Sequence, residues 1–315
     1  MSPPEGACLG DPARRAPRGE PPSRSEIGRL RRGVLRGSSE LWREFPWRAT
    51  RDPWLVLVSE VMLQQTQARR VVDPFTRFVS RFPTPAACAG AGPAEVVRAW
   101  AGLGYNRRAL NLHRTAAVLV ERHAGRVPDD LDALVDLPGV GPYTARAVLA
   151  FAYGRPVGVV DSNVMRVLSR AAAGRALAPR EAQRLADRLV PSSDAWRFNQ
   201  ALLDLGAGRC TARAPGCGSC HLLEQCRWAR ALSEAGAGTD VADPAALRRR
   251  QGRFAGSDRQ GRGRLVGVLR VAPVPVGMVA SAAGWPDDEP RALRVAEALV
   301  AEGLASWRQG ALALA

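Results

Sequence analysis

Apolar residues recur at helical spacing along most of the chain between residues 25 and 206. The first such pattern consists of Ile27, Leu30, Val34 and Leu35, and Ser25 precedes it as a candidate helix cap. Further helices are predicted at 53–66, 68–82, 93–101, 107–124, 129–136, 142–153, 162–173, 181–190 and 194–206. Because alternating strand patterns are essentially missing from this span, the region is predicted to be all-α.

The pattern changes on both sides of this helical region. Residues 1–25 are rich in Pro, Gly and Arg and lack an apolar period, which predicts a disordered basic N-terminus. Residues 231–252 are predicted to form a linker. A small C-terminal module is expected at 253–315, where a helical pattern at 291–304 precedes alternating residues around Gln309-Gly310. This order suggests a winged-helix-like unit, and a helix with a frayed tail is the alternative.

The charge of the chain indicates a polyanionic partner. Its 315 residues include 45 basic and 30 acidic side chains, a formal net charge of +15, and all the basic ones are arginine because lysine is absent. Arginine guanidinium groups match phosphate oxygens and release counterions when they bind nucleic acid. A GC-rich coding bias would explain arginine in place of lysine, but it would not explain the excess of basic over acidic residues.

Hydropathy and cysteine spacing indicate the cellular compartment in which the protein is expected. No apolar run reaches the roughly 18 residues that a membrane span requires, and the first residues lack a hydrophobic signal core. We therefore expect a cytoplasmic, nucleoid-associated monomer. Of the six cysteines, four fall between Cys210 and Cys226, which suits a metal site in a reducing compartment better than a disulfide framework.

The stretch LPGVGPYTARA, from Leu137 to Ala147, places two glycines between predicted helices. Gly139 and Gly141 can adopt positive φ and carry no side chain, so a tight hairpin would leave backbone N–H groups bare at a helix start. Such a position favours an anion, for example a DNA phosphate. Taken alone, the glycines would favour an ordinary turn between two helices.

A carboxylate follows the hairpin. Asp161 immediately precedes a predicted helix, where backbone N–H groups and the helix dipole favour its charged form. This order of helix, glycine hairpin, helix and carboxylate resembles the helix-hairpin-helix DNA glycosylase superfamily. The resemblance implies an all-α, two-lobed fold, phosphate contacts from Gly139, Val140 and Gly141, and a catalytic role for Asp161.

The residue after the hairpin proline separates two branches of that superfamily. Members that also cut the DNA backbone place a lysine where this chain has Tyr143, and that lysine forms a Schiff base with the sugar. Tyr143 has no amine, and the chain contains no lysine. The resemblance therefore implies a monofunctional glycosylase, in which water replaces the attack by lysine.

The stretch PWRATRDPWLVLVSEVMLQQTQARRV, from Pro46 to Val71, indicates which base is removed. It resembles the adenine glycosylases of the MutY type, whose SEVMLQQTQ segment appears unchanged from Ser59 to Gln67. The endonuclease III-type relatives lack the glutamate of that segment, here Glu60. A protonated carboxyl near N7 would make adenine a neutral leaving group, and the apolar neighbours of Glu60 favour the neutral acid.

The resemblance assigns further residues to the catalytic pocket. Tyr143 and Asn163 match positions that line the pocket and help to place water or Asp161. Trp47 and Arg48, in the PWR segment, match contacts to the target base.

Other matched positions contact DNA outside the pocket. Leu63 and Gln65 resemble the wedge that enters the base stack as adenine swings out. Tyr105, in AGLGYN, matches a tyrosine that stacks beside the opposing base. The family commonly has a second tyrosine next, whereas this chain has Asn106.

The segment CTARAPGCGSCHLLEQC resembles the [4Fe–4S] loop of the superfamily. Its ligands would be Cys210, Cys217, Cys220 and Cys226, although four thiolates at this spacing could also bind zinc. Arg209 and Arg213 lie among them and could face phosphate. The resemblance then predicts a cluster lobe from 26–46 and 157–230 and a helical lobe with the hairpin from 47–156.

Together these features predict a glycosylase that acts on double-stranded DNA and excises adenine mispaired with 8-oxoguanine or guanine. A mismatch-specific thymine glycosylase of the same superfamily is one alternative, although thymine offers no N7 to protonate. A non-enzymic iron–sulfur DNA-binding protein is the other. Many family members end in a Nudix-like domain that reads 8-oxoguanine, and residues 253–315 lack a pattern long enough for it.

Overall fold

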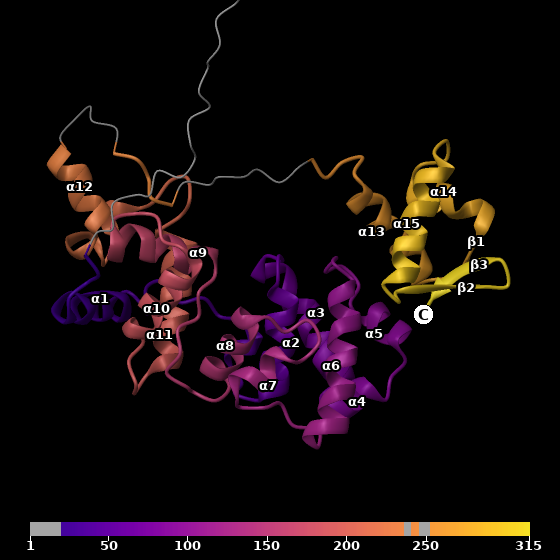
Figure 1. Cartoon of the computed structure of the whole chain (residues 1–315), viewed down its shortest axis with the longest axis horizontal. Coiled ribbons are helices and arrows are strands. Elements are labelled where there is room, and N and C mark those ends of the chain that lie inside the picture. The colour runs from indigo at the N-terminus through magenta and orange to yellow at the C-terminus, as the bar shows by residue number, and fades with distance from the viewer. Residues whose placement is uncertain (1–19, 236–240, 246–252) are drawn as a thin grey trace, which may run out of the picture. The chain divides into compact units, whose positions relative to one another are not determined.

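The computed structural model describes residues 20–235, 241–245 and 253–315 (Figure 1). The predicted disorder of residues 1–19, and residues 236–240 and 246–252 of the predicted linker, lie outside these ranges. The described residues form two compact units. The first takes them from Met1–Trp42, Val160–Pro191 and Arg197–Leu247, and the second from Arg43–Val159, Ser192–Trp196 and Arg248–Ala315.

The larger part of the second unit is a bundle of helices. These are η1 (Pro46–Arg48), α2 (Pro53–Leu63), α3 (Ala68–Arg81), α4 (Pro85–Ala89), α5 (Pro93–Ala99), α6 (Arg107–His123), α7 (Leu131–Val135) and α8 (Pro142–Phe151). Helix α2 packs against α3, α6 and α8 and is buried on almost every side, which explains why its sequence is apolar nearly all round. Phe78 and Trp100 lie fully buried in the core of this bundle, edge to face with ring centroids 5.8 Å apart.

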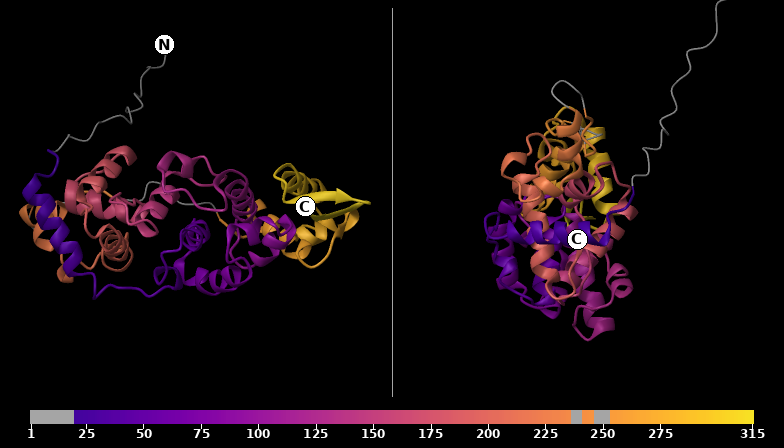
Figure 2. Two further views of the ribbon diagram at one scale, coloured as in Figure 1. Left: turned by 90° about the horizontal axis from the view of Figure 1, so that it is seen from below. Right: turned by 90° about the vertical axis from the view of Figure 1, so that its left-hand side faces the viewer.

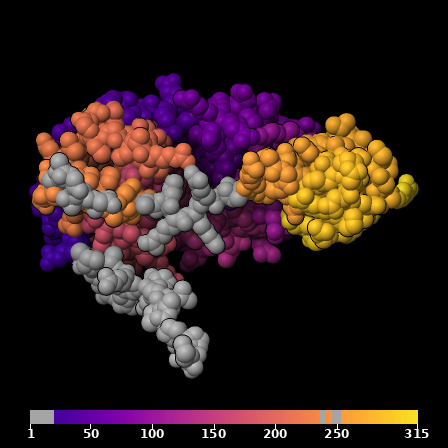
Figure 3. Space-filling view, turned by 90° about the horizontal axis from the view of Figure 1, so that it is seen from above, coloured from indigo at the N-terminus to yellow at the C-terminus, as the bar shows by residue number. Residues whose placement is uncertain are grey.

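The second unit also contains the C-terminal module, which we define as Arg253–Ala315. Its elements are α13 (Asp258–Leu269), β1 (Val274–Pro275), η6 (Val276–Met278), α14 (Val279–Ala283), α15 (Glu289–Ala301), β2 (Ala305–Arg308) and β3 (Ala311–Leu314). The strands form an antiparallel sheet in the order β1-β3-β2 (Figure 1). Figure 2 shows arrows of this sheet in yellow near the C-terminus. Figure 3 shows the module, in orange to yellow, as one packed body.

The C-terminal helix and hairpin predicted from the sequence are confirmed. Strands β2 and β3 meet at Gln309 (φ +48°) and Gly310 (φ +77°), the two left-handed residues that a tight hairpin turn requires. Leu265, Ala296 and Leu312, one from each of α13, α15 and β3, are fully buried. The module therefore has a small core of its own, and the alternative of a frayed tail is wrong.

The first unit consists of α1 (Arg24–Arg36), α9 (Ser162–Val167), η2 (Leu168–Ala173), α10 (Pro179–Leu189), α11 (Ala195–Asp204), η3 (Leu205–Arg209), η4 (Cys217–Ser219), η5 (Leu223–Gln225) and α12 (Arg227–Ala235), with the start of α11 belonging to the second unit. The stretches predicted as single helices at 162–173 and 194–206 change to π-helical turns at Leu168 and Leu205. A Cβ atom on Gly206 would lie 2.8 Å from Cβ of Asn163, so this close packing requires glycine. An apolar period does not reveal such turns, because the same faces stay buried.

Two predicted boundaries differ from the structure. Helix α12 runs to Ala235, past the predicted start of the linker at 231. Helix α1 is capped by Ser23 and not by Ser25, because Glu26 stands three residues after Ser23 and completes a reciprocal capping box. None of the described helices is both long and apolar enough to cross a membrane.

The carboxylate of Glu26 is expected to stabilise the first unit. Hydrogen bonds from the Ser23 backbone (2.8 Å) and from Arg227 (3.0 Å) lower its pKa to about 2. Its stabilising effect is complete above its ordinary pKa of 4.5 and is lost as the pH falls toward 2. Glu26→Gln should lower the free energy of unfolding by about 1 kcal/mol at pH 7.

The test is thermal unfolding of both proteins between pH 7 and pH 3. The difference in unfolding temperature should shrink as the pH falls, while Glu234→Gln, at an exposed position of α12, should behave like the wild type. A difference that stayed constant with pH would contradict the role of the ionised carboxylate.

Candidate active site

Glu60 lies near the middle of α2, in the second unit. Its side chain is only 4% exposed, and Leu57, Val58 and Val61 on the same helix are buried with it. Asp52 caps the start of α2, and its carboxylate accepts from the N–H groups of Trp54 and Leu55. A carboxyl in such apolar surroundings is favoured in its neutral form, which can donate a proton.

The end of α2 is joined to the glycine hairpin. The Gln64 amide donates to Oγ1 of Thr144 (3.1 Å) and to the carbonyl oxygen of Gly139 (3.4 Å). The Thr115 hydroxyl donates to the carbonyl oxygen of Pro138 (2.8 Å). These bonds, with the packing of α2 on α8, fix the hairpin relative to the helix that carries Glu60.

The hairpin follows only part of the expectation drawn from its glycines. Gly139 has φ +77°, and a Cβ atom there would lie 2.8 Å from Asn111. Both the backbone conformation and the lack of space for a side chain therefore require glycine. Gly141 is extended at φ −94° and precedes α8 as a cap residue without a side-chain bond. Val140 is buried, and its N–H donates to Leu137 within the turn, so this N–H is not bare as predicted.

Arg108, at the start of α6, holds two loops together. It is buried, and burial lowers the pKa of its guanidinium to about 10, so it remains charged at neutral pH. Its donors reach backbone carbonyls at the end of α2, the Thr66 hydroxyl, and carbonyls of the loop before α6. The acceptors are Val61 (2.9 Å), Met62 (2.7 Å), Gln64 (2.6 Å), Thr66 (3.0 Å), Leu103 (3.2 Å), Gly104 (3.2 Å) and Tyr105 (3.4 Å).

Two of the predicted DNA contacts sit at the loops that Arg108 holds. Gln65 (φ +54°) and Tyr105 (φ +46°) both adopt the left-handed conformation, which is unfavourable for residues other than glycine. Gln65 is exposed, and Tyr105 is 45% exposed with its ring against the Arg108 guanidinium. Leu63, at the last turn of α2, is half-buried.

The predicted base-pocket residues Trp47 and Arg48 belong to an aromatic cluster. Trp47 is 7% exposed, stacked on Phe45 with ring centroids 4.8 Å apart and edge-on to Phe75 at 5.6 Å. Arg48 donates to the carbonyl oxygen of Arg43 (2.7 Å) and lies over the Phe45 ring. Tyr143 is half-buried in the first turn of α8.

Asp161, in the first unit, caps α9. One carboxylate oxygen accepts from the N–H of Val164 (2.7 Å) and the other from the Asn163 amide (2.9 Å). Asn163 in turn accepts from Arg166 (2.8 Å), which also donates to the carbonyl oxygens of Gly206 and Cys210, both at 2.6 Å. Asn163, expected to place Asp161, thus bonds it directly, and the chain of bonds continues to the cysteine loop.

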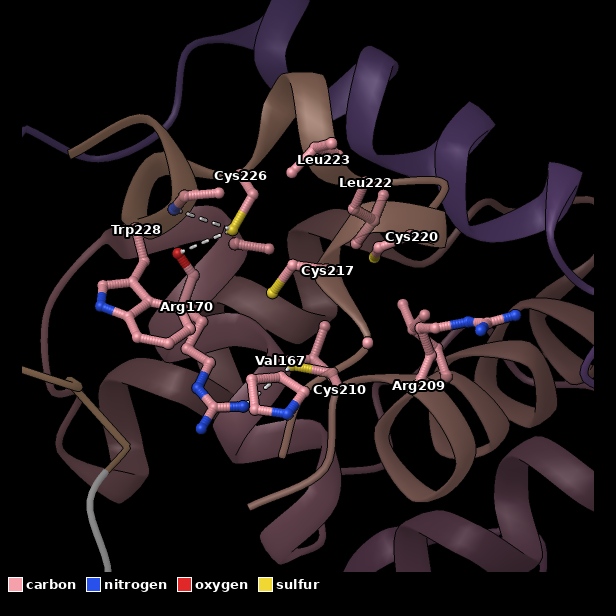
Figure 4. Close-up of a pocket in the computed structure, with 15 residues that line it drawn as sticks. Val167, Arg170, Arg209, Cys210, Cys217, Cys220, Leu222, Leu223, Cys226 and Trp228 are labelled. Carbon is pink, nitrogen blue, oxygen red and sulfur yellow. Dashed lines mark hydrogen bonds between the residues drawn. The ribbon is translucent and has the colours of Figure 1, made fainter. Parts of the chain in front are cut away.

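The four clustered cysteines line one pocket of the first unit (Figure 4). The residues are Cys210, Cys217, Cys220 and Cys226. Burial raises the pKa of the last three thiols, which favours their protonated form. Within the described ranges, no three His, Cys, Asp or Glu side chains are placed so that they could hold a metal ion.

Arginines secure the cysteine loop in a way that sequence reasoning missed. Arg170 is 2% exposed, donates to the Thr211 carbonyl oxygen (2.7 Å) and to Sγ of Cys210 (3.4 Å), and pairs with Asp243 (2.6 Å). Arg209, expected to face phosphate, instead forms an ion pair with Glu40. Arg213 is exposed. In a chain whose basic residues are all arginine, composition cannot distinguish Arg108, Arg166 or Arg170 from solvent-exposed arginines.

Comparison with known proteins identifies the family. A family model described as HhH-GPD superfamily base excision DNA repair protein matches residues 58–192. An adenine DNA glycosylase from Mycolicibacterium smegmatis is 45% identical over 266 residues, covering 83% of this chain and 87% of that protein. One from Mycobacterium tuberculosis H37Rv is 46% identical over 268 residues, covering 83% and 85%. The structure of a thermostable thymine-DNA glycosylase matches with TM-score 0.63 and 31% identity, covering 66% of this chain and 98% of that one.

These matches cover the helices that carry Glu60, the hairpin and Asp161. The chain therefore belongs to the helix-hairpin-helix base-excision DNA glycosylases. Within that superfamily its place is with the MutY-type adenine DNA glycosylases, because the similarity to them extends over most of both chains.

Arg108 provides a test of how the loops around the site are held. Arg108→Lys keeps the charge but loses the fork of donors that joins the end of α2 to the loop before α6. The free energy of unfolding should fall by about 2–4 kcal/mol, because several buried carbonyls lose their charged partner. Chemical denaturation measures this loss.

The matched control is Arg107→Lys, at the exposed neighbouring position, which should change stability by less than about 0.5 kcal/mol. Equal effects of the two substitutions would show that Arg108 does not join these loops.

Proposed function

We propose that this chain is a monofunctional DNA glycosylase that flips adenine, mispaired with 8-oxoguanine or guanine, out of duplex DNA and excises it with water. The observation that carries the proposal is Glu60, a buried carboxyl on α2 among apolar side chains. The membership in the adenine DNA glycosylase family supports the same base.

Glu60 would act as the general acid. A neutral carboxyl can donate a proton to N7 of the flipped adenine, which lets the base leave as a neutral molecule while positive charge builds on the sugar. A positioned acid of this kind contributes roughly a hundredfold to ten-thousandfold to the rate. Thymine has no equivalent nitrogen, so the same group would be of little use in its removal.

Asp161 would act as the anion that complements this acid. Its carboxylate accepts two hydrogen bonds, from the N–H of Val164 and from the Asn163 amide. An ionised carboxylate can stabilise an oxocarbenium-like sugar or attack it, as in glycosidases. Asn163 fixes the orientation of that carboxylate, and Tyr143 occupies the position at which a lyase lysine would stand.

The surface residues would hold the distorted duplex. Leu63 and Gln65 fill the base stack, and Tyr105 stacks beside the opposing base. Gly139 and Gly141 present the hairpin backbone to a phosphate, and the missing side chain at Gly141 allows close approach. Trp47 supports the base pocket from the aromatic cluster, and Arg48 borders it.

The cysteine pocket would hold a [4Fe–4S] cluster through Cys210, Cys217, Cys220 and Cys226. All four line the same pocket, yet in the described residues they are not placed for a single metal ion. Four cysteine thiolates are a donor set that suits such a cluster and also suits zinc, so the metal content of the purified protein decides between the two. When bound, the cluster would crosslink the loop, and Arg170 and Arg166 tie that loop to η2 and α9.

The C-terminal module would be winged-helix-like. Its order of helix, strand, two helices and two strands, with β3 between β1 and β2, is the arrangement of that fold. The hairpin of β2 and β3 would form the wing.

A mismatch-specific thymine glycosylase is a second candidate, because a thymine-DNA glycosylase structure matches two thirds of the chain at 31% identity. Glu60 is the feature that argues against it, so the base released decides between the two.

Glu60→Gln should abolish excision and leave DNA binding intact, because glutamine has nearly the same shape but cannot donate an acidic proton. Single-turnover release of base should fall about a hundredfold to ten-thousandfold. The substrates are duplexes with A opposite 8-oxoguanine, A opposite G and T opposite G, treated with or without alkali. Strand breaks should appear only after alkali, since no lysine is present.

Glu121→Gln, at an exposed position of α6, is the matched control and should act as the wild type. Excision of adenine by Glu60→Gln at the wild-type rate would refute the acid role. Release of thymine alone by the wild type would favour the second candidate.

Cys226→Ser should remove the cluster. The purified wild type should contain about four iron atoms and matching sulfide, with visible absorption, and the variant should lose both. Cys88→Ala, at a buried cysteine of α4 outside the pocket, should retain the iron. Zinc in the wild type, without iron, would disprove the cluster.

A further inference from the structure

The C-terminal module contacts the helical bundle of its unit at Arg270, the residue after α13, and at Glu302, whose carbonyl oxygen accepts from Arg114 of α6 (3.4 Å). The Arg270 guanidinium donates from Nε to the carbonyl oxygen of Val97 (3.1 Å) and from Nη2 to Oδ1 of Asn106 (2.7 Å). In return, Arg98 donates from Nε to the carbonyl oxygen of Arg270 (3.2 Å). Arg98 and Arg270 therefore hold the end of α13 against α5 and the loop before α6.

The side chain of Asn106 is used in this contact with Arg270. Its side chain is 6% exposed, and it occupies the cap position of α6 without capping that helix by a side-chain bond. Asparagine is a favoured cap residue, so this is an unusual use of it. The amide oxygen instead accepts from the module, which ties the start of α6 to Arg270.

The residue next to Asn106 is Tyr105, whose left-handed backbone must be held in place. On one side Arg108 donates to the carbonyl oxygens of Gly104 (3.2 Å) and Tyr105 (3.4 Å). On the other side Asn106 is held by Arg270. The half-exposed Tyr105 ring thus stands on a strained loop that is fixed at both ends.

The module itself is poorly suited to grip phosphate through α15. That helix starts after Asp287 and Asp288 and begins with Glu289, a run of carboxylates that would repel DNA. Arg291, in its first turn, is paired with Asp258 (2.6 Å). Arg262, on α13, is paired with Glu302 (2.5 Å). These two arginines are therefore occupied within the module.

We propose that the C-terminal module is a brace for the Tyr105 loop, residues 102–107. Arg270 is the positioning residue, and Asn106 accepts its hydrogen bond. The module then sharpens the contact with the opposing base by stiffening Tyr105, without touching that base. This inference rests on the proposed stacking role of Tyr105, whereas the mechanical coupling from Arg270 to the loop does not depend on it.

Hydrogen exchange by mass spectrometry tests the mechanical coupling on the full chain without DNA. Arg270→Ala should raise amide exchange in residues 102–107 about tenfold, while peptides of α2 and of the module core stay protected. Arg308→Ala removes the same charge from the exposed end of β2 and should leave the loop unchanged. Unchanged exchange in 102–107 with Arg270→Ala would overturn the brace.

A second pair of variants separates the bond from the volume of Asn106. Asn106→Asp keeps an oxygen acceptor for Arg270 and should retain the protection of the loop. Asn106→Leu keeps a similar volume without the acceptor and should match Arg270→Ala. Combining Asn106→Leu with Arg270→Ala should add little, because both remove the same bond. Additive effects would contradict direct coupling.

DNA binding tests the consequence, with Glu60→Gln as the background so that the substrate stays intact. The probes are duplexes with A opposite 8-oxoguanine, opposite guanine, and opposite an abasic analogue that offers nothing to stack on. With Arg270→Ala added, the ratio of affinity for a duplex with an opposing base to affinity for the abasic duplex should fall by about fivefold. This is the order of effect expected when one base–aromatic stack is weakened. Arg308→Ala should leave that preference unchanged.

The outcomes distinguish the brace from the proposed function. Weaker binding with Arg308→Ala, and no change in loop exchange with Arg270→Ala, would mean that the module binds DNA itself, which overturns the brace. If Arg270→Ala raises exchange in the loop but the wild type releases no adenine, the glycosylase proposal is refuted and the brace stands.

Discussion

The guanidinium of Arg108 is the interaction on which the rest of the second unit's functional surface depends. It is buried among backbone carbonyls from the last turn of α2 and from the loop before α6, two segments far apart in the sequence. A fixed cation with a planar fork of donors can satisfy all of them at once, which a lysine could not. Without it, the strained residues Gln65 and Tyr105 would lose what holds them, and the helix that carries Glu60 would lose its terminal anchor.

The two carboxyl groups lie in contrasting surroundings. Glu60 is buried inside an apolar helix. Asp161 stands at a helix start, where an N–H group and an amide bond both of its oxygens. Asn163 and Arg166 connect Asp161 to the backbone of Cys210, so the order of the cysteine loop and the orientation of the carboxylate are mechanically linked.

The sequence was most informative where a period or a motif has a single physical meaning. Helical periods predicted the bundle, and alternation around Gln309-Gly310 predicted the terminal hairpin. It failed where geometry depends on neighbours distant in the chain. The extended backbone of Gly141, the π-helical turns and the pairing of Arg209 with Glu40 all arise from tertiary packing. The roles of Arg108, Arg170 and Arg270 could not be predicted, because nothing local distinguishes them from the other arginines of the chain.

The left-handed conformations of Gln65 and Tyr105 set stability against recognition. Glycine would adopt either backbone conformation without the penalty of about 1 kcal/mol that a larger residue incurs. It would also remove the side chain to which a DNA contact is proposed at each loop tip. A chain optimised only for heat resistance would therefore place glycine at both positions. At these two loop tips, engineering for a higher melting temperature would remove the side chains proposed to contact DNA.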